Sequence, residues 1–220
     1  VQTCALPICF RQWRFDAPDG LITLTGPGPY AASRTVASVL SVHPCTHGDM
    51  LLSIGTCAAL NPQCATGTLD RIHSLVDLAS QKRFYPDLLL ASALPEASLL
   101  TGGQILDVQK KSVWMTDADC VLPDLYDMES AAIFSAASLF MGPEQMTFLR
   151  VVSDSGDGVV TSEDVRDQIT HTMPEILQAM DDLSRFGNAL SAAQSSAPAI
   201  PYALAFQDFL MDLRATDAMQ

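Results

Sequence analysis

Two stretches decide the fold of this chain: DMESAAIFSAASLF at residues 127–140 and MTFLRVVSD at residues 146–154. The first is rich in alanine and apolar nearly all round, which predicts a buried helix over 128–140 with Asp127 as its N-cap. The second predicts a core strand, because it is a continuous apolar run. The helix start carries Glu129 and the strand exit carries Asp154, so one helix–strand unit brings two carboxylates together.

The rest of the chain alternates strand and helix patterns. A β-rich run at 21–25, a helical pattern at 30–41 and an apolar strand at 50–54 that ends in the loop 55–59 predict parallel strands covered on both faces. Further strands are expected near 67–76, 98–102 and 105–109, with an aromatic loop at 83–87 and a helix end at Gly142-Pro143. We then expect one helix from Thr161, a second from Thr172 to Gly187, a linker at 191–201 and an amphipathic helix at 202–214.

Composition narrows the class of partner. The 220 residues are 48% hydrophobic with a formal net charge of −13, which fits one globular domain. The acidic balance makes nucleic acids and anionic membranes poor partners, and no apolar run reaches the roughly 18 residues needed to span a bilayer. A small neutral or cationic ligand suits this charge better. The six cysteines form no Cys-x-x-Cys pair, which favours free thiols in a reducing cytoplasm.

The first residues read differently from the rest. The sequence VQTCALPI at 1–8 matches one reading frame of a common short-read sequencing adapter. We therefore expect residues 1–9 to be an artefact and the domain to occupy 10–190 without its first strand. Residues 191–220 are expected to form the linker and the C-terminal helix.

Three other motifs have simpler explanations than ligand binding. GPGPYA at 26–31 fits a dinucleotide turn, but its prolines remove N–H donors, so we expect a tight strand-to-helix turn. SDSGDG at 153–158 has the composition of a calcium loop, but a strand and a loop flank it instead of two helices. HPCTHGD at 43–49 contains metal-ligand types but reads as a turn. We expect no metal site.

The two carboxylates have both a structural and a functional explanation. Glu129 complements the dipole of the helix that it begins, and Asp154 is a polar residue at a strand exit. The carboxyl ends of strands are also where open α/β sheets bind ligands. The pair together favours a site that binds a sugar and protonates a leaving group.

Four motifs in order resemble the nucleoside phosphorylase and nucleosidase superfamily. DMESAA at 127–132 resembles its D-M-E-x-A-A signature, and RVVSD at 150–154 resembles its R-x-x-S-D strand. IGTCA at 54–58 resembles the I/T-G-S/T-x-G loop, and LTGPG at 24–28 resembles the S-G-x-G turn. The motifs cover about residues 20–155. The resemblance implies a three-layer α/β/α sandwich whose central mixed sheet curls toward a barrel.

The same resemblance implies cleavage of the N-glycosidic bond of a purine nucleoside or a thio-derivative, in purine or methionine salvage. It implies that Asp154 donates a proton or hydrogen bond to N7 of the purine and that Glu129 accepts hydrogen bonds from the ribose hydroxyls. Among the substrate-binding residues, Met128 would pack against the sugar, and Ser153 and Arg150 would position the acids. Gly55 and Thr56 belong to the matching loop.

Water or phosphate remains open as the nucleophile. Phosphorylases of this superfamily carry an arginine just before the Gly-Ser/Thr loop, whereas Ser53 stands at the matching position here. We therefore favour a hydrolase that resembles methylthioadenosine/adenosylhomocysteine nucleosidases. The alternatives are a phosphorylase, with phosphate as co-substrate, and a nucleoside-binding protein without catalysis. No other cofactor is expected.

The sequence also departs from the superfamily. The first strand and the following loop, which carries the water-activating glutamate of the nucleosidases, have no counterpart. Ala58 and Ala59 stand where many members have glycines, and the loop at 83–87 is unlike that of common nucleosidases. Phe84 or Tyr85 are the candidates for contact with the base or the 5′ group. The superfamily implies a homo-oligomer, a dimer or a hexamer, with small-molecule nucleosides as ligands.

Overall fold

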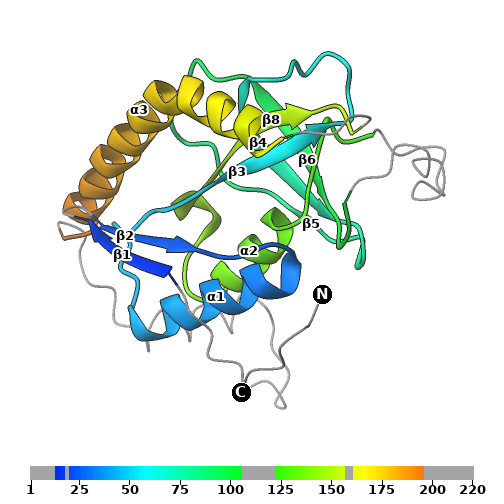
Figure 1. Ribbon diagram of the computed structural model, residues 1–220. Helices are drawn as coiled ribbons and strands as arrows, with labels where there is room; N and C mark the ends of the chain where they lie inside the picture. The colour runs from blue at the N-terminus through cyan, green and yellow to red at the C-terminus, as the bar shows by residue number, and fades with distance from the viewer. Residues whose placement is uncertain (1–12, 18–19, 106–121, 157–160, 196–220) are drawn as a thin grey trace, which may run out of the picture.

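The computed structural model describes residues 13–17, 20–105, 122–156 and 161–195. It builds a mixed sheet with helices on both sides (Figure 1). In chain order the elements are β1 (Trp13–Ala17), β2 (Gly20–Leu24), α1 (Pro29–Val42), β3 (Leu51–Ala59), β4 (Leu69–Asp77), β5 (Arg83–Phe84), β6 (Glu96–Thr101), β7 (Leu125–Asp127), α2 (Ser130–Ala137), the 3₁₀ turn η2 (Pro143–Gln145), β8 (Met146–Asp154) and α3 (Ser162–Ser195).

The six-stranded sheet runs in the order β5-β4-β6-β7-β3-β8 and closes on itself where β4 also pairs with β8. β3 pairs with β8, and β6 with both β4 and β7, in parallel. β3 with β7, and β4 with β8 and β5, are antiparallel. This mixed, partly barrel-like sheet between helices confirms the fold class that the resemblance implies.

Cross-strand register divides the side chains between two faces, because directly opposite residues on paired strands point to the same side. One row crosses β8, β3, β7, β6 and β4 and contains Asp154, Ala58, Tyr126, Leu100 and Val76. The next row lies on the other face and contains Ala59, Leu125, Leu99, Leu75 and Phe84. The two faces therefore carry different residues of the expected site.

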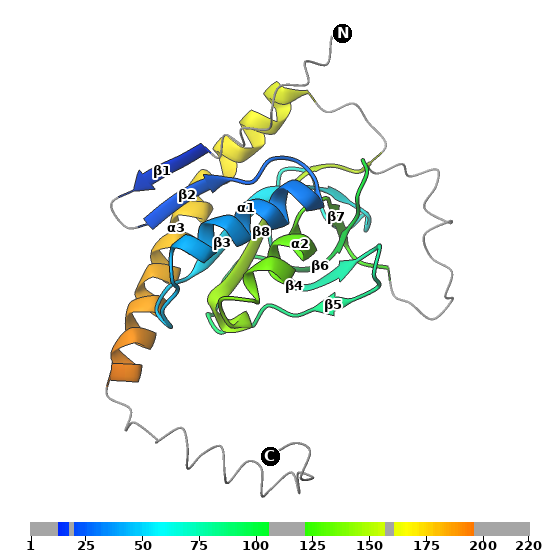
Figure 2. The same cartoon turned by 90° about the horizontal axis from the view of Figure 1, so that it is seen from below.

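The second row belongs to the main core. It packs against Phe134, Ala131 and Ala137 of α2 and against Ala32 of α1. The small alanines let α1 and α2 lie side by side under the sheet, as both views show (Figures 1 and 2). On the first face, Ile176 of α3 packs on Leu149 and Val151 of β8. The apolar run of β8 is thus buried from both sides, as expected for a central strand.

The predicted strands and helices are largely confirmed, with corrections where tertiary pairing overrides the local pattern. β3 does not end at 54 but continues through Ala59, because β8 and β7 pair along that stretch. The prediction that the first two strands run parallel in one sheet is wrong, since β2 pairs antiparallel with β1 in a separate hairpin. Part of the expected aromatic loop at 83–87 is strand β5, paired with β4.

The helix predictions also need correction. α2 is shorter than 128–140 and its N-cap is Glu129, because Asp127 is drawn into β7 by pairing with β6. The helix ends at Ala137, before Gly142-Pro143, which begins η2 instead. The two helices expected after Thr161 are one, α3, which passes through Pro174 and continues past Gly187. Proline removes only one backbone donor, and the buried Thr172 before it and Ile176 after it hold both halves of the helix against the protein.

Some predictions fall outside the described residues. The helix at 202–214, the adapter-like residues 1–9 and most of the strand at 105–109 are among them, and Ile105 itself is not in a strand. The segment 43–49 forms the expected turn between α1 and β3. No helix in the described ranges is long and apolar enough to cross a membrane.

Candidate active site

Glu129 lies between the end of β7 and the start of α2, and its side chain forms a hydrogen bond with the start of α1. Its Oε1 accepts a 2.6 Å hydrogen bond from the backbone N–H of Gly28, the residue that caps α1. Its Oε2 lies 3.3 Å from the N–H of Met128. Gly28 has φ +84°, a conformation that side chains other than glycine rarely adopt. The Gly-Pro-Gly turn thus serves the carboxylate, as an anion-binding helix N-terminus does.

Asp154 ends β8 and is held by both carboxyl oxygens. Its Oδ1 accepts a hydrogen bond from the N–H of Gly156 at 2.7 Å. Its Oδ2 lies 2.7 Å from Ser153 Oγ, which also lies 3.0 Å from the carbonyl oxygen of Cys57. Ser153 is buried, whereas Asp154 is only partly covered. Ser153 is therefore placed to orient the carboxyl group.

Arg150 holds a buried network below these acids. Its Nε donates to Asp127 at 3.0 Å, its Nη1 to the carbonyls of Ser53 and Leu149, and its Nη2 to the hydroxyls of Ser53 and Ser130. A guanidinium has five N–H donors, and these five bonds use all of them. Arg150 and Asp127 are each almost fully buried, at 2% and 1% side-chain exposure.

Asp127 is in turn shared by three neighbours. Besides Arg150, it accepts hydrogen bonds from the hydroxyl of Thr101 at 2.7 Å and from the N–H of Ser130, the first residue of α2. The side chain expected to cap the helix does bind its first N–H, although it does so from a strand. Asp127 thereby joins β6, β7, β8 and α2 and fixes the chain from which Glu129 extends.

The remaining expected site residues lie on two different faces of the sheet. Thr56 shares the face of Ala58 and hence of Asp154, because both lie on alternate positions of β3. Gly55 lies on the opposite face, where a Cβ would sit 3.4 Å from the Arg150 guanidinium carbon. Met128 packs with Tyr126, Leu100 and Val76 in a small cluster on the Asp154 face.

The two aromatic candidates lie elsewhere. Phe84 belongs to the row on the α2 face and its ring centroid lies 5.1 Å from that of Phe134. Tyr85 is 57% exposed beside the edge strand. The structure therefore brings neither of them into the cluster around Glu129 and Asp154.

Sequence reasoning missed several residues that surround the acids. Gly28, Gly156 and Ser130 contribute backbone or hydroxyl groups, and Ala58 and Tyr126 lie in the cross-strand row of Asp154. Gly28, Ala58 and Ser130 stand inside three of the quoted motifs, but the motifs alone did not indicate their contacts. The contact of Gly156 with Asp154 is local, whereas those of Gly28 and of the cross-strand row depend on register and on segments far apart in the chain.

The electrostatics of the site disfavour the thiolate form of Cys57, the cysteine beside Ser153. Burial raises the pKa of Cys57 well above its ordinary value, although the nearby Arg150 charge acts in the opposite direction. The thiol therefore stays protonated. Among the described residues, no group of three or more His, Cys, Asp or Glu side chains could hold a metal ion.

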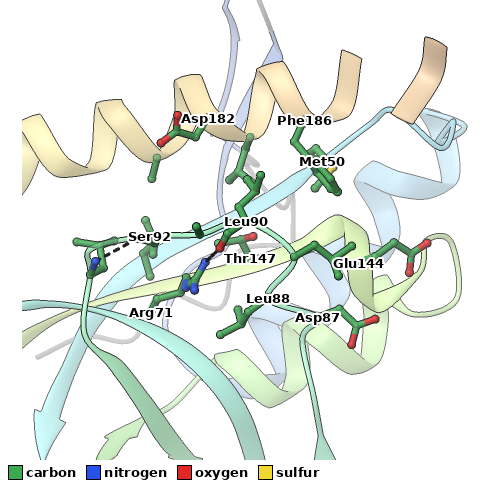
Figure 3. A pocket seen from close by; sticks show the side chains of 16 residues that line it. Met50, Arg71, Asp87, Leu88, Leu90, Ser92, Glu144, Thr147, Asp182 and Phe186 are labelled. Atoms are coloured by element: carbon green, nitrogen blue, oxygen red, sulfur yellow. Dashed lines mark hydrogen bonds between the residues drawn. The ribbon is translucent and has the colours of Figure 1, made fainter. Parts of the chain in front are cut away.

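A small cavity of about 40 Å³ lies away from these acids. It is lined by the segment 87–94, by Leu183 and Phe186 of α3 and by Thr147 of β8 (Figure 3). Thr147 and Asp154 are seven residues apart on one strand, roughly 23 Å at 3.3 Å per residue. Arg71 in its wall donates to the Leu90 carbonyl and to Glu96. The cavity is thus separate from the candidate active site.

Comparison with solved structures identifies the fold. The chain is similar to the 5′-methylthioadenosine/S-adenosylhomocysteine nucleosidase (MTAN) of Campylobacter jejuni, with TM-score 0.55 and 13% identity over 84% of this chain and 90% of that one. MTAN of Chlamydia trachomatis gives TM-score 0.54 and 19% identity over 80% and 84%. A mutant of the futalosine hydrolase of Helicobacter pylori gives 0.57 and 14% over 74% and 79%. No protein-family model and no curated protein matches the chain.

These likenesses define a class by its architecture. The chain has the fold of nucleosidases, in agreement with the resemblance carried by its four motifs. MTAN and futalosine hydrolase are among the proteins that share it, and at 13–19% identity they define the fold and not the substrate.

Proposed function

We propose that this protein hydrolyses the N-glycosidic bond of a purine nucleoside or a 5′-thio-nucleoside and releases the free base. Asp154 protonates the leaving base and Glu129 binds the ribose hydroxyls. The proposal is supported by the nucleosidase fold and by the positions of the two carboxylates, Asp154 at the end of β8 and Glu129 just beyond the end of β7, since both strands pair with β3.

The observation that carries the proposal is the hydrogen-bond count at Ser153. A serine hydroxyl has one hydrogen, and the carbonyl of Cys57 can only accept. Ser153 Oγ lies 3.0 Å from that carbonyl and 2.7 Å from Asp154 Oδ2, so its one hydrogen can go to either acceptor. The serine can therefore contact Asp154 both when the acid carries the proton to be transferred and after it has given that proton up.

Glu129 suits the complementary role. Each carboxylate oxygen offers about two acceptor positions, and the backbone N–H groups of Gly28 and Met128 use one on each oxygen. The remaining positions are available to the 2′- and 3′-hydroxyls of a ribose, which are donors. The neighbouring Met128 gives an apolar surface for the sugar.

Water is favoured over phosphate because of Arg150. All five of its N–H donors bind protein groups, and one of those groups is Ser53, at the position where phosphorylases carry their arginine. A phosphate at this point would have to displace bonds that are buried and charge-assisted. Hydrolysis needs no such cation.

The reaction then balances with the residues named. The bond between C1′ and the base nitrogen breaks, its electron pair goes to the base, and the Asp154 proton neutralises that charge at N7. Water adds hydroxide to the ribose cation at C1′, and the proton left from the water restores Asp154. Glu129 stabilises the developing positive charge through the ribose hydroxyls.

The test is release of free base by the full chain, with and without phosphate. We expect equal rates in both buffers and free ribose as the second product. A rate that requires phosphate and yields ribose 1-phosphate would establish the phosphorylase alternative instead. Thermal stabilisation by nucleosides without turnover would leave only a binding function.

A further inference from the structure

Tyr126 is a buried residue that the proposed reaction does not use directly. Only 4% of its surface is exposed, and its ring packs with Leu100, Val76 and Met128. Its hydroxyl donates a 2.5 Å hydrogen bond to the backbone carbonyl of Gln104. That bond connects the short strand β7 to the segment 102–105, which leaves the end of β6.

Tyr126 lies near both acids of the proposed site. In the cross-strand row it is separated from Asp154 only by Ala58, which places the two Cα atoms roughly 10 Å apart, or two strand spacings. Along the chain it precedes Glu129 by three residues. Because Ala58 has only a methyl group, the sheet between Tyr126 and Asp154 carries no large side chain in this row.

The segment 102–105 passes directly over the phenol hydroxyl. The N–H of Gly102 donates to the carbonyl of Asp127 at 2.9 Å, so the segment starts level with the residue that precedes Met128. A Cβ on Gly102 would lie 2.1 Å from the Tyr126 hydroxyl oxygen and 2.7 Å from its ring. Glycine is therefore required at 102 as long as tyrosine stands at 126.

We propose that Tyr126 is a positioning residue for substrate binding: its hydroxyl tethers the Gln104 carbonyl and thereby holds segment 102–105 as one wall of the nucleoside site, beside Met128 and Glu129. This inference rests on the proposed function. It assigns the tether to binding and leaves proton transfer to Asp154.

The Tyr126 hydroxyl retains its hydrogen at neutral pH and can donate it to Gln104. Burial raises the pKa of Tyr126, and the negative charges of Asp127 and Glu129 raise it further, against the opposing effect of the Gln104 hydrogen bond. Since the ordinary pKa of a tyrosine is already about 10, the phenol stays protonated at neutral pH. The tether therefore holds at neutral pH.

The test compares Tyr126→Phe with wild type in nucleoside turnover. Phenylalanine keeps the ring in its cluster and removes the hydroxyl that holds the Gln104 carbonyl, so a loosened wall must be reordered when substrate binds. We expect KM to rise about 5- to 20-fold while kcat stays within about twofold. Gly102→Ala should raise KM in the same way, because the new methyl displaces the phenol. Tyr30→Phe is the matched control, since Tyr30 is 87% exposed on α1.

Hydrogen exchange gives a second readout that does not depend on turnover. Amides of 103–105 should exchange faster in Tyr126→Phe than in Tyr30→Phe. A KM within twofold of wild type, or a fall in kcat at unchanged KM, would overturn the tether as a binding device.

If wild type releases no base, the proposed function fails by itself. Calorimetry with nucleoside then decides: about tenfold weaker binding by Tyr126→Phe supports the tether, and equal binding or none by either protein refutes it.

Discussion

Asp154→Asn separates catalysis from structure at this site. Asparagine has nearly the same shape as aspartate, and the contacts around residue 154 accept it. Its Oδ1 can take the Gly156 N–H, and its Nδ2 can donate to Ser153 Oγ while the serine hydroxyl donates to Cys57. Every hydrogen bond of the aspartate is thus preserved. What is lost is the transferable proton.

The expected size of the effect follows from that difference. General acid catalysis contributes typically about 10²- to 10⁴-fold, so kcat should fall by that factor, or about 3–5.5 kcal/mol in activation free energy. The free energy of unfolding should change by less than about 0.5 kcal/mol, because no buried group loses its partner.

The assay is release of free base followed by ultraviolet absorbance in phosphate-free buffer, with urea unfolding in parallel. Asp181→Asn is the control, because Asp181 is an exposed residue of α3 with 69% side-chain exposure. A kcat for Asp154→Asn within threefold of wild type refutes the general-acid role. A parallel loss of several kcal/mol of stability would instead make Asp154 a structural residue.

Three further predictions concern the surrounding groups. Arg150→Lys offers three donors for five acceptors, so it should lower the free energy of unfolding measured in urea by about 1–3 kcal/mol. The main reason is that buried Asp127 loses a well-placed partner. A loss below about 0.5 kcal/mol would contradict the importance of this hydrogen-bond network. Glu129→Gln replaces an acceptor-only carboxylate, so KM should rise about 10- to 100-fold in steady-state assays, and an unchanged KM would exclude ribose binding there. Burial raises the pKa of Asp124, but hydrogen bonds from Asn61 and the Ser98 N–H outweigh it and the net pKa is lowered. A lowered pKa gives stability that is present above the unfolded pKa of about 3.9 and is lost as pH falls through the folded value. Urea unfolding at pH 7 and pH 3 should therefore show a smaller acid-induced loss in Asp124→Asn than in wild type, and equal losses would contradict this assignment.

The sequence identified the elements whose pattern is local. The apolar run of β8 and the alanine-rich α2 are visible as continuous patterns, and the positions of Glu129 and Asp154 follow because each stands at the end of such a pattern. Where contacts with distant segments set the ends of an element, the local sequence pattern did not predict those ends correctly. β3 extends to Ala59 because β7 and β8 lie beside it, and α3 runs through Pro174 because its buried face packs on the protein from both sides of the proline.

The sequence by itself thus predicted the fold class, through four motifs that resemble a known superfamily, and located the two carboxylates at the ends of segments that hydrophobic periodicity marks as buried. Only the tertiary structure decided what surrounds those carboxylates. Gly28 reaches Glu129 across 101 residues, and Arg150 reaches Ser53 across 97. Tyr126 faces the same side as Asp154 only because of the register of β3 with its two neighbours. Such contacts depend on register and close packing, to which residues far apart in sequence contribute jointly.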